Sequence, residues 1–289
     1  MRKNIIAALL ISLVINQFPA VAEPFSDRIN VTVRGNGPDV LLIPGLTCSI
    51  AVWDATAKQL AGHYRLHLVQ VAGFAGTPAR ANAKGAVIQP IVAAIDAYIK
   101  TNHLDKPKVI GHSMGGFIGM NLALAHPEDL SKLMIVDSLP FFSVILGADD
   151  IAAAEPQAAN LRDTMLSESQ AAYVEGEKQF LPVLVKSPEG LKAATQWAIA
   201  SDKTVVARAT YELMTTDLRP KLREIRTPVT LLYPWDAASG FPQEATDHLY
   251  QENFASLPNK KLVRIPNSFH FIMFDQPQAF VAQIDAFLK

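Results

Sequence analysis

The chain has 289 residues, of which 49% are hydrophobic and 18% are charged, and its formal net charge is −1. This composition supplies a large core and excludes an intrinsically disordered chain, and the length suits one α/β domain with an insertion. No basic stripe of the kind that binds nucleic acid stands out, so we expect no nucleic-acid partner.

The first residues predict a secretion signal. Arg2 and Lys3 precede a short apolar run, and the small-x-small sequence that ends at Ala22 is typical of a cleavage site. We therefore expect a signal peptide over residues 1–22, cleaved after Ala22, and a periplasmic or secreted bacterial protein. The apolar run is about half the roughly 20 residues that a membrane span needs, so no integral membrane span is expected after signal removal.

Strand-like and helix-like segments then alternate along the chain. Short apolar runs bounded by turn residues predict strands, and longer amphipathic runs predict helices. The expected strands lie within residues 29–45 (two strands around a turn), 65–73, 106–111, 131–138, 227–234 and 260–267, and the expected helices within 52–63, 86–104, 114–127 and 277–289. This alternation predicts a mostly parallel sheet with helices on both faces.

The alternation breaks between about Phe141 and Arg226, where helical periodicity dominates and no convincing strand occurs. We therefore expect an α/β core formed by residues 23–140 and 227–289. A helical lid, residues 141–226, is expected to interrupt it.

The sequence "GHSMG", residues 111–115, lies between an expected strand and an expected helix. A serine on such a sharp turn needs small neighbours, and it projects above the carboxyl end of the sheet. The N–H of Met114 lies at the helix N-terminus, where donors are free and the dipole favours negative charge. This arrangement predicts Ser113 as a nucleophile and Met114 as one donor of an oxyanion hole.

A serine nucleophile needs a base, and the base needs an orienting partner. His270 lies in a loop after the last expected strand and before the last expected helix, from which it can reach back over the strand ends. The other six histidines flank a strand, lie at helix ends, lie within a helical stretch or lie beside the serine. His270 is therefore the expected base.

At these residues the chain resembles the α/β-hydrolase superfamily, in the branch of lidded serine esterases, lactonases and carbon–carbon hydrolases that share Gly-x-Ser-Met-Gly-Gly. "LLIPGLTCSIAVWD" is similar to the oxyanion loop of that family, "GHSMGG" to its nucleophile turn, and "NSFHFIMFDQPQAF" to its histidine loop. The resemblance implies an α/β-hydrolase fold and Leu46 as the second oxyanion donor.

The resemblance also implies an acid after the strand "PVTLLY", usually in a Gly-x-x-Asp turn. The sequence there reads "YPWD", so the glycine is absent and Asp236 comes one residue early. Asp236 is the expected acid. The alternative acid is Asp137, at the end of the strand that follows the nucleophile helix, a position that some superfamily members use.

Ser113 distinguishes this chain from the dehalogenases and epoxide hydrolases of the superfamily, which carry an aspartate at the turn. The expected function is a serine hydrolase that acts on a small carboxylic ester or related acyl substrate through an acyl-enzyme. The alternatives are a lyase or cofactor-free oxygenase with the same residues, and a ligand-binding protein on this fold. No cofactor and no metal ion are expected, because no complete dinucleotide or chelating motif occurs.

Overall fold

The computed structural model describes residues 25–289. The expected signal peptide and its cleavage site at Ala22 lie outside the described residues. Within them, no helix combines the length and the apolar character needed to cross a membrane.

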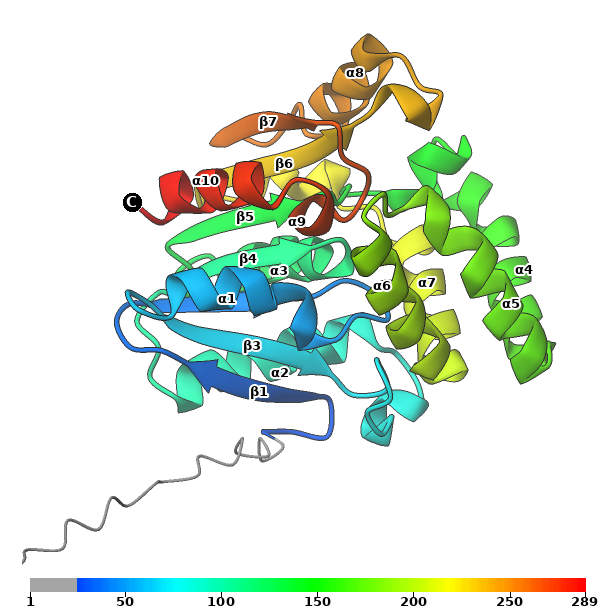
Figure 1. Cartoon of the computed structure of the whole chain (residues 1–289), viewed down its shortest axis with the longest axis horizontal. Helices are drawn as coiled ribbons and strands as arrows, with labels where there is room; N and C mark the ends of the chain where they lie inside the picture. The colour runs from blue at the N-terminus through cyan, green and yellow to red at the C-terminus, as the bar shows by residue number, and fades with distance from the viewer. Residues whose placement is uncertain (1–24) are drawn as a thin grey trace, which may run out of the picture.

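A seven-stranded sheet forms the centre of the molecule (Figure 1), in the order β1-β3-β2-β4-β5-β6-β7. β1 pairs with β3 in the antiparallel direction, and all the other neighbouring strands are parallel. The carboxyl ends of six strands therefore meet at one edge of the sheet, where loops can bring side chains together. The strands are β1 (Ile29–Arg34), β2 (Asp39–Ile43), β3 (Arg65–Val71), β4 (Lys108–His112), β5 (Lys132–Val136), β6 (Val229–Trp235) and β7 (Lys260–Pro266).

Helices cover both faces of this sheet. Side chains of α2, α3 and α8 pack on one face, and side chains of α1, α9 and α10 pack on the other. These helices are α1 (Asp54–Leu60), α2 (Ile88–Thr101), α3 (Met114–Ala125), α8 (Gln243–Asn253), α9 (Ile272–Asp275) and α10 (Pro277–Leu288). The predicted α/β fold with a mostly parallel sheet is confirmed.

Strand β2 shows why the central strands have continuous apolar sequences. Val40 and Leu42 belong to the apolar cluster on one face, and Leu41 and Ile43 belong to the cluster on the other. All four side chains are fully buried. Because successive side chains of a strand point to opposite faces, a strand covered on both faces must be apolar at every position.

Residues 141–226 between β5 and β6 form a helical insertion that contains no strand. It lies beside the edge at which the parallel strands end (Figure 1). A side-chain oxygen caps the N-terminus of each of its four α-helices, which explains where each helix begins. These helices are α4 (Ile151–Ser167), α5 (Gln170–Phe180), α6 (Pro188–Ala200) and α7 (Lys203–Thr215), with caps Asp150, Ser169, Ser187 and Asp202.

Short 3-10 helices complete the described chain. They are η1 (Ile50–Trp53), η2 (Arg80–Ala83), η3 (Phe142–Leu146), η4 (Leu181–Val183), η5 (Arg219–Glu224) and η6 (Ala237–Ser239). Trp53, at the end of η1, is fully buried and its ring stacks on Phe280 at 6.3 Å between centroids. This tryptophan therefore packs between α10 and the sheet.

Two glycines let α3 approach the strands closely. A Cβ atom at Gly115 would lie 2.1 Å from the carbonyl oxygen of Ile43, and one at Gly111 would lie 2.2 Å from the carbonyl oxygen of Gly115. These atoms belong to backbone and cannot move aside without shifting the strand or the helix. The positions two residues before and two residues after Ser113 therefore require glycine.

We predict that Gly115→Ala lowers the free energy of unfolding by about 1–3 kcal/mol or more, because the added methyl group overlaps the backbone of β2. Urea denaturation measures this change. The matched control is Gly62→Ala, where a Cβ atom has no neighbour within 4 Å, and the expected change there stays within about 0.5 kcal/mol. Equal stability of the two variants would contradict the packing described for α3.

Candidate active site

Ser113 occupies a strained turn between β4 and α3. Its backbone angles are φ 53° and ψ −121°, a region that non-glycine residues rarely adopt. Backbone strain of this kind costs about 1–3 kcal/mol and persists only where the surroundings hold it. Here the N–H of Ser113 donates to the carbonyl of Val136 at 2.9 Å, and its own carbonyl accepts from the N–H of Gly116 at 2.8 Å.

The turn that follows β2 lies against this serine. A Cβ atom at Gly45 would come within 3.1 Å of the Ser113 Cβ, so the two backbones pass close together. The carbonyl of Gly45 accepts from the N–H of Cys48 at 3.2 Å, and Leu46 lies within the tight turn that this bond closes. Met114 is the first residue of α3, so its N–H has no acceptor within the helix. The turn that contains Leu46 and the start of α3 at Met114 thus both border Ser113.

Cys48, in the same turn, is buried, and burial raises the pKa of its thiol to about 12. A thiol with such a pKa keeps its proton at neutral pH, so Cys48 is not an alternative nucleophile.

His270 lies in the loop between β7 and α9, and its imidazole contacts Asp137. The Nδ1–H of His270 donates to Asp137 Oδ2 at 2.6 Å, and 22% and 12% of the two side chains remain exposed. A carboxylate at Nδ1 fixes the tautomer of the ring and leaves Nε2 as the acceptor. This is the arrangement that a histidine needs to take a proton from a nearby hydroxyl.

His112, next to the serine, fixes the backbone of His270. Its Nε2–H donates to the His270 carbonyl at 3.1 Å, and the two ring centroids are 4.6 Å apart. Burial, and then the charge of His270, hold the pKa of His112 well below its usual value, so the ring stays neutral. His112 is therefore a structural support for the loop that holds His270.

Asp137 is the first residue after β5, and it leaves the strand with φ 48°. Its N–H donates to the carbonyl of Leu232 at 2.8 Å, so the neighbouring strand β6 holds its backbone. Oδ1 of its carboxylate accepts from the hydroxyl of Tyr250, while Oδ2 accepts from His270. The carboxylate is thus held at both oxygens.

Asp236 does not meet the expectation that it contacts His270. Its Oδ2 binds the ammonium group of Lys186, and its Oδ1 accepts from the N–H of Ala238 at 2.7 Å. The hydrogen bond from Lys186, aided by the one from Ala238, holds the pKa of Asp236 below its usual value. Asp236, the expected acid, thus caps η6 and faces the helical insertion, whereas Asp137, the alternative acid, contacts the imidazole.

Asp275 connects the histidine loop to the helical insertion, a contact that sequence reasoning missed. Its Oδ2 accepts from the N–H of Phe269 at 2.8 Å. Its Oδ1 accepts from the N–H groups of Lys186 and Ser187 at 3.0 and 2.9 Å. No sequence signal marks this contact, because its partners are backbone N–H groups that almost any residue supplies.

Ser201 connects the insertion to the turn after β2. Its hydroxyl lies 3.3 Å from the carbonyl oxygen of Thr47 and accepts from the N–H of Ala75 at 2.9 Å. The insertion therefore contacts the segments beside Ser113 and those beside His270.

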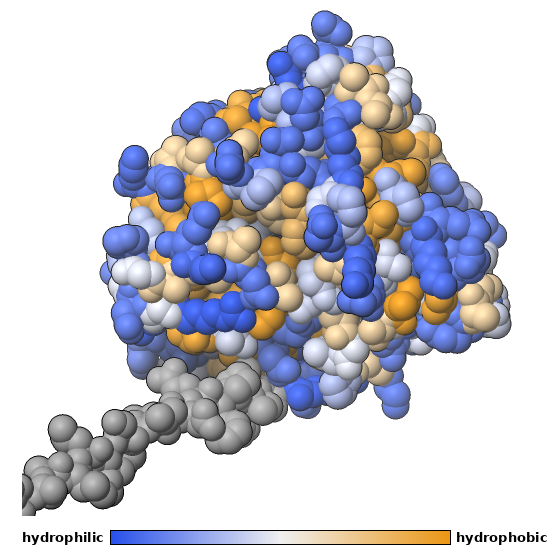
Figure 2. Space-filling view, in the orientation of Figure 1, coloured by the Kyte–Doolittle hydropathy of each residue, from blue (hydrophilic) through white to orange (hydrophobic). Residues whose placement is uncertain are grey.

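The helical insertion also exposes apolar side chains. Of the large apolar side chains that are exposed within residues 25–289, most lie on it. They are Ile145, Leu146, Ile151, Leu161, Leu166, Phe180 and Val183. Figure 2 shows apolar residues among polar ones on this side of the molecule.

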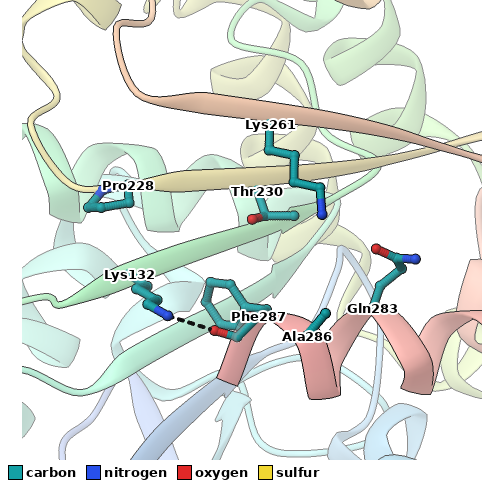
Figure 3. Close-up of a pocket in the computed structure, with 7 residues that line it drawn as sticks. All are labelled: Lys132, Pro228, Thr230, Lys261, Gln283, Ala286 and Phe287. Carbon is teal, nitrogen blue, oxygen red and sulfur yellow. Dashed lines mark hydrogen bonds between the residues drawn. The ribbon is translucent and has the colours of Figure 1, made fainter. Parts of the chain in front are cut away.

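A hollow of about 200 Å³ lies at the opposite edge of the sheet (Figure 3). Lys132, at the start of β5, and Phe287, near the end of α10, line it, and the ammonium group of Lys132 donates to the Phe287 carbonyl at 3.1 Å. It borders the amino ends of the strands, so it is separate from the Ser113 site.

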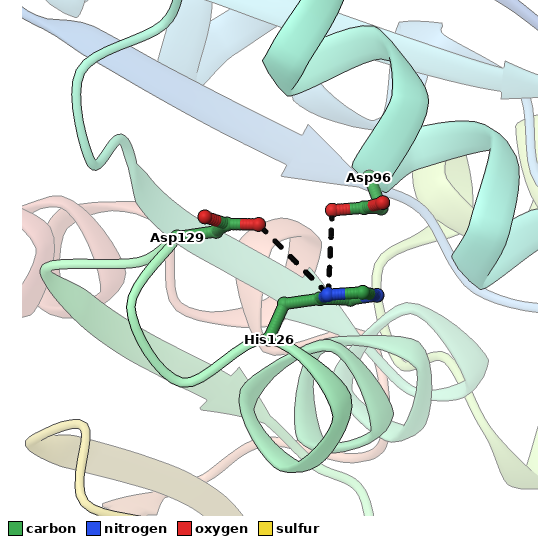
Figure 4. A group of neighbouring side chains, drawn as sticks. All are labelled: Asp96, His126 and Asp129. Atoms are coloured by element: carbon green, nitrogen blue, oxygen red, sulfur yellow. Dashed lines mark ion pairs between the residues drawn. The ribbon is translucent and has the colours of Figure 1, made fainter.

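Three potential metal ligands gather at the end of α3 that is remote from Ser113: Asp96, His126 and Asp129 (Figure 4). The Nδ1 atom of His126 lies 3.6 Å from Asp96 Oδ1. The ammonium group of Lys100 lies 2.9 Å from that oxygen and 3.5 Å from Asp129 Oδ2. Because a cation of the protein already pairs with both carboxylates, this group is a surface ion-pair cluster.

The chain matches a known protein family over most of its length. Residues 40–283 match the sequence model of the family described as "Alpha/beta hydrolase family". The match covers more than half of the chain, so the chain belongs to the alpha/beta hydrolase family.

Similar proteins in this family are named as esterases. The chain is 27% identical over 268 residues to the pimeloyl-[acyl-carrier protein] methyl ester esterase of Nitrosomonas europaea, and the match covers 89% of this chain and 98% of that protein. A shorter match, 39% identical over 114 residues, covers 39% of this chain and 43% of the protein of the same name from Aeromonas salmonicida.

Among solved structures, the enol-lactonase of Burkholderia xenovorans superposes with a TM-score of 0.71 at 18% identity, over 90% of this chain and 96% of that one. At that identity the likeness shows the fold alone. The family match, together with the relatives named as esterases, confirms the expected superfamily and its fold. It also confirms the expected class of enzyme, a serine hydrolase that resembles carboxylic ester hydrolases.

We predict that Asp275→Asn lowers the free energy of unfolding by about 1–3 kcal/mol. An amide has one acceptor oxygen instead of two, and its NH₂ group would face backbone N–H donors. Thermal or urea denaturation measures the change. Asp285→Asn, at an exposed position on α10, is the control and should leave stability within about 0.5 kcal/mol. Indistinguishable effects of the two substitutions would contradict the role given to Asp275.

Proposed function

We propose that this protein is a serine esterase in which Ser113, His270 and Asp137 form the catalytic triad. The observation that carries the proposal is the hydrogen bond from His270 Nδ1 to Asp137 Oδ2, beside a serine on a strained strand-to-helix turn. This bond leaves the Nε2 atom of His270 available as a base. The substrate class is a small carboxylic ester, in line with the relatives named as esterases.

In the proposed mechanism, Ser113 Oγ attacks the ester carbonyl carbon while His270 Nε2 takes the hydroxyl proton. The carbonyl oxygen becomes an oxyanion, which the N–H groups of Leu46 and Met114 stabilise. When the C–O bond to the alcohol breaks, His270 returns the proton to the leaving alkoxide. A water molecule then attacks the acyl-enzyme with His270 again as the base, releasing the acid and restoring Ser113. Asp137 holds the imidazole in the required tautomer throughout.

The helical insertion, residues 141–226, is proposed to act as the lid over this site. Two features support the assignment. It lies beside the carboxyl ends of the strands, and its contacts reach the turn after β2 through Ser201 and the histidine loop through Asp275. Its exposed apolar side chains suit an apolar acyl group, because small-molecule sites are lined mainly by apolar residues.

We also propose that the protein is exported to the periplasm or beyond. The support is the sequence alone: Arg2 and Lys3, the apolar run and the cleavage site at Ala22. In a bacterial host, the protein from the periplasmic or culture fraction is expected to begin at Glu23 by N-terminal sequencing. Recovery of the protein in the cytoplasm with its first 22 residues intact would overturn the export proposal.

The triad is tested by steady-state hydrolysis of p-nitrophenyl butyrate. We expect Ser113→Ala to lower kcat about 10⁶-fold, because the covalent step is lost. Asp137→Asn should lower kcat about 10³–10⁴-fold, because an amide supports the wrong histidine tautomer.

The matched control is Asp236→Asn, which changes the neighbouring strand-end carboxylate and should lower kcat by less than about tenfold, since Asp236 contacts Lys186 and not His270. A larger loss in Asp236→Asn than in Asp137→Asn would overturn the choice of acid. Full activity of Ser113→Ala would overturn the covalent mechanism, and absence of turnover in the unaltered protein would favour a lyase, an oxygenase or a binding protein.

A further inference from the structure

Tyr250 reaches the proposed site from α8, a helix that contributes no member of the triad. Its hydroxyl donates to Asp137 Oδ1, and the side chain is 6% exposed. The other oxygen of the same carboxylate accepts the Nδ1–H of His270. A hydroxyl, a carboxylate and an imidazole thus form one continuous chain of hydrogen bonds from Tyr250 to His270.

The ring of Tyr250 is itself held firmly. It stacks on Tyr233 of β6, with ring centroids 4.4 Å apart and an interplanar angle of 25°. The hydroxyl of Tyr233 donates to Asp247 at 2.8 Å, and Asp247 also pairs with Arg264 of β7. The two tyrosines are therefore neighbours with similar surroundings, but only one of them bonds to Asp137.

The carboxylate of Asp137 needs this second contact. The backbone of Asp137 is fixed by strand β6, but its side chain can still rotate about the bonds to the carboxylate. One hydrogen bond from the imidazole leaves part of that rotation free, whereas two donors on the two oxygens define one orientation. The two oxygens of the carboxylate thus each accept one hydrogen bond, from the Tyr250 hydroxyl and from the Nδ1–H of His270.

The hydroxyl is suited to act as a donor only. Burial, and then the negative charge of Asp137, raise the pKa of Tyr250 well above its usual value. It therefore keeps its proton at neutral pH.

We propose that Tyr250 is a positioning residue for catalysis, which fixes the Asp137 carboxylate and thereby holds His270 in the orientation that activates Ser113. The kinetic consequences of this role rest on the proposed function. The hydrogen bond from Tyr250 to Asp137 does not depend on it.

The experiment compares Tyr250→Phe with Tyr233→Phe. Each removes one hydroxyl from the stacked pair, and only Tyr250→Phe removes a donor to Asp137. We expect kcat for p-nitrophenyl butyrate to fall about tenfold in Tyr250→Phe with KM changed less than about twofold, since a hydrogen bond to a charged group is lost. Tyr233→Phe should keep kcat within about twofold of the unaltered protein. Equal kcat in the two variants would overturn the inference.

A second readout does not depend on turnover. The proton between His270 Nδ1 and Asp137 is expected to give a downfield ¹H resonance in ¹⁵N-histidine-labelled protein. Its exchange with water should quicken in Tyr250→Phe and stay unchanged in Tyr233→Phe. An unchanged resonance in Tyr250→Phe would contradict the positioning role even if the protein hydrolyses no ester.

Failure of the Tyr250 inference and failure of the proposed esterase function give different results. If Ser113→Ala and Asp137→Asn abolish activity but Tyr250→Phe does not lower it, only this inference fails. If the unaltered protein has no esterase activity, the proposed function fails and the resonance still decides the inference. If Tyr250→Phe does not fold, the contact is tested in Asp137→Asn instead. The ring signal of Tyr250 in ¹³C-tyrosine-labelled protein should shift in Asp137→Asn, and the absence of a shift would overturn the contact.

Discussion

The site depends on the strained turn at Ser113. A strand from the centre of the sheet ends one residue before the serine, and α3 begins one residue after it. Because α3 starts directly after the serine, the N–H of its first residue, Met114, has no acceptor within the helix and lies beside the proposed nucleophile. The turn exists only because glycines at 111 and 115 allow contact with backbone atoms closer than a Cβ would permit. The same two glycines are therefore required both for the packing of α3 on β2 and for the geometry of the proposed nucleophile.

Carboxylates at neighbouring strand ends perform different tasks around this turn. Asp137, after β5, faces the imidazole of His270, whereas Asp236, after β6, pairs with Lys186 of the helical insertion. Asp275, in the histidine segment, binds the backbone of the same insertion residue. The insertion is thus attached to the loops that surround His270. A movement of the insertion would therefore displace these loops. These contacts are the physical basis for the proposal that the insertion acts as a lid over Ser113.

The sequence predicts those parts of the molecule that depend on neighbouring residues. The strand, turn and helix around Ser113 are local, and His270 is identified because it lies in a loop at the expected edge. The choice between Asp137 and Asp236 is not local. It depends on the positive φ at Asp137 and on its bond to Leu232, a residue of the strand that continues toward Asp236. Distance along the sequence from a strand end cannot show which carboxylate turns toward the imidazole.

The contacts of Tyr250 and Asp275 were beyond sequence reasoning for the same reason, since their partners lie 113 residues and up to 89 residues away along the chain. In the proposed mechanism, Ser113 is a nucleophile activated by His270. The most direct test is reaction of the unaltered protein with a fluorophosphonate, followed by mass spectrometry of its peptides. We expect one adduct, on Ser113, that forms as esterase activity disappears. Loss of activity with the adduct on another residue, or esterase activity that persists without any adduct, would contradict it.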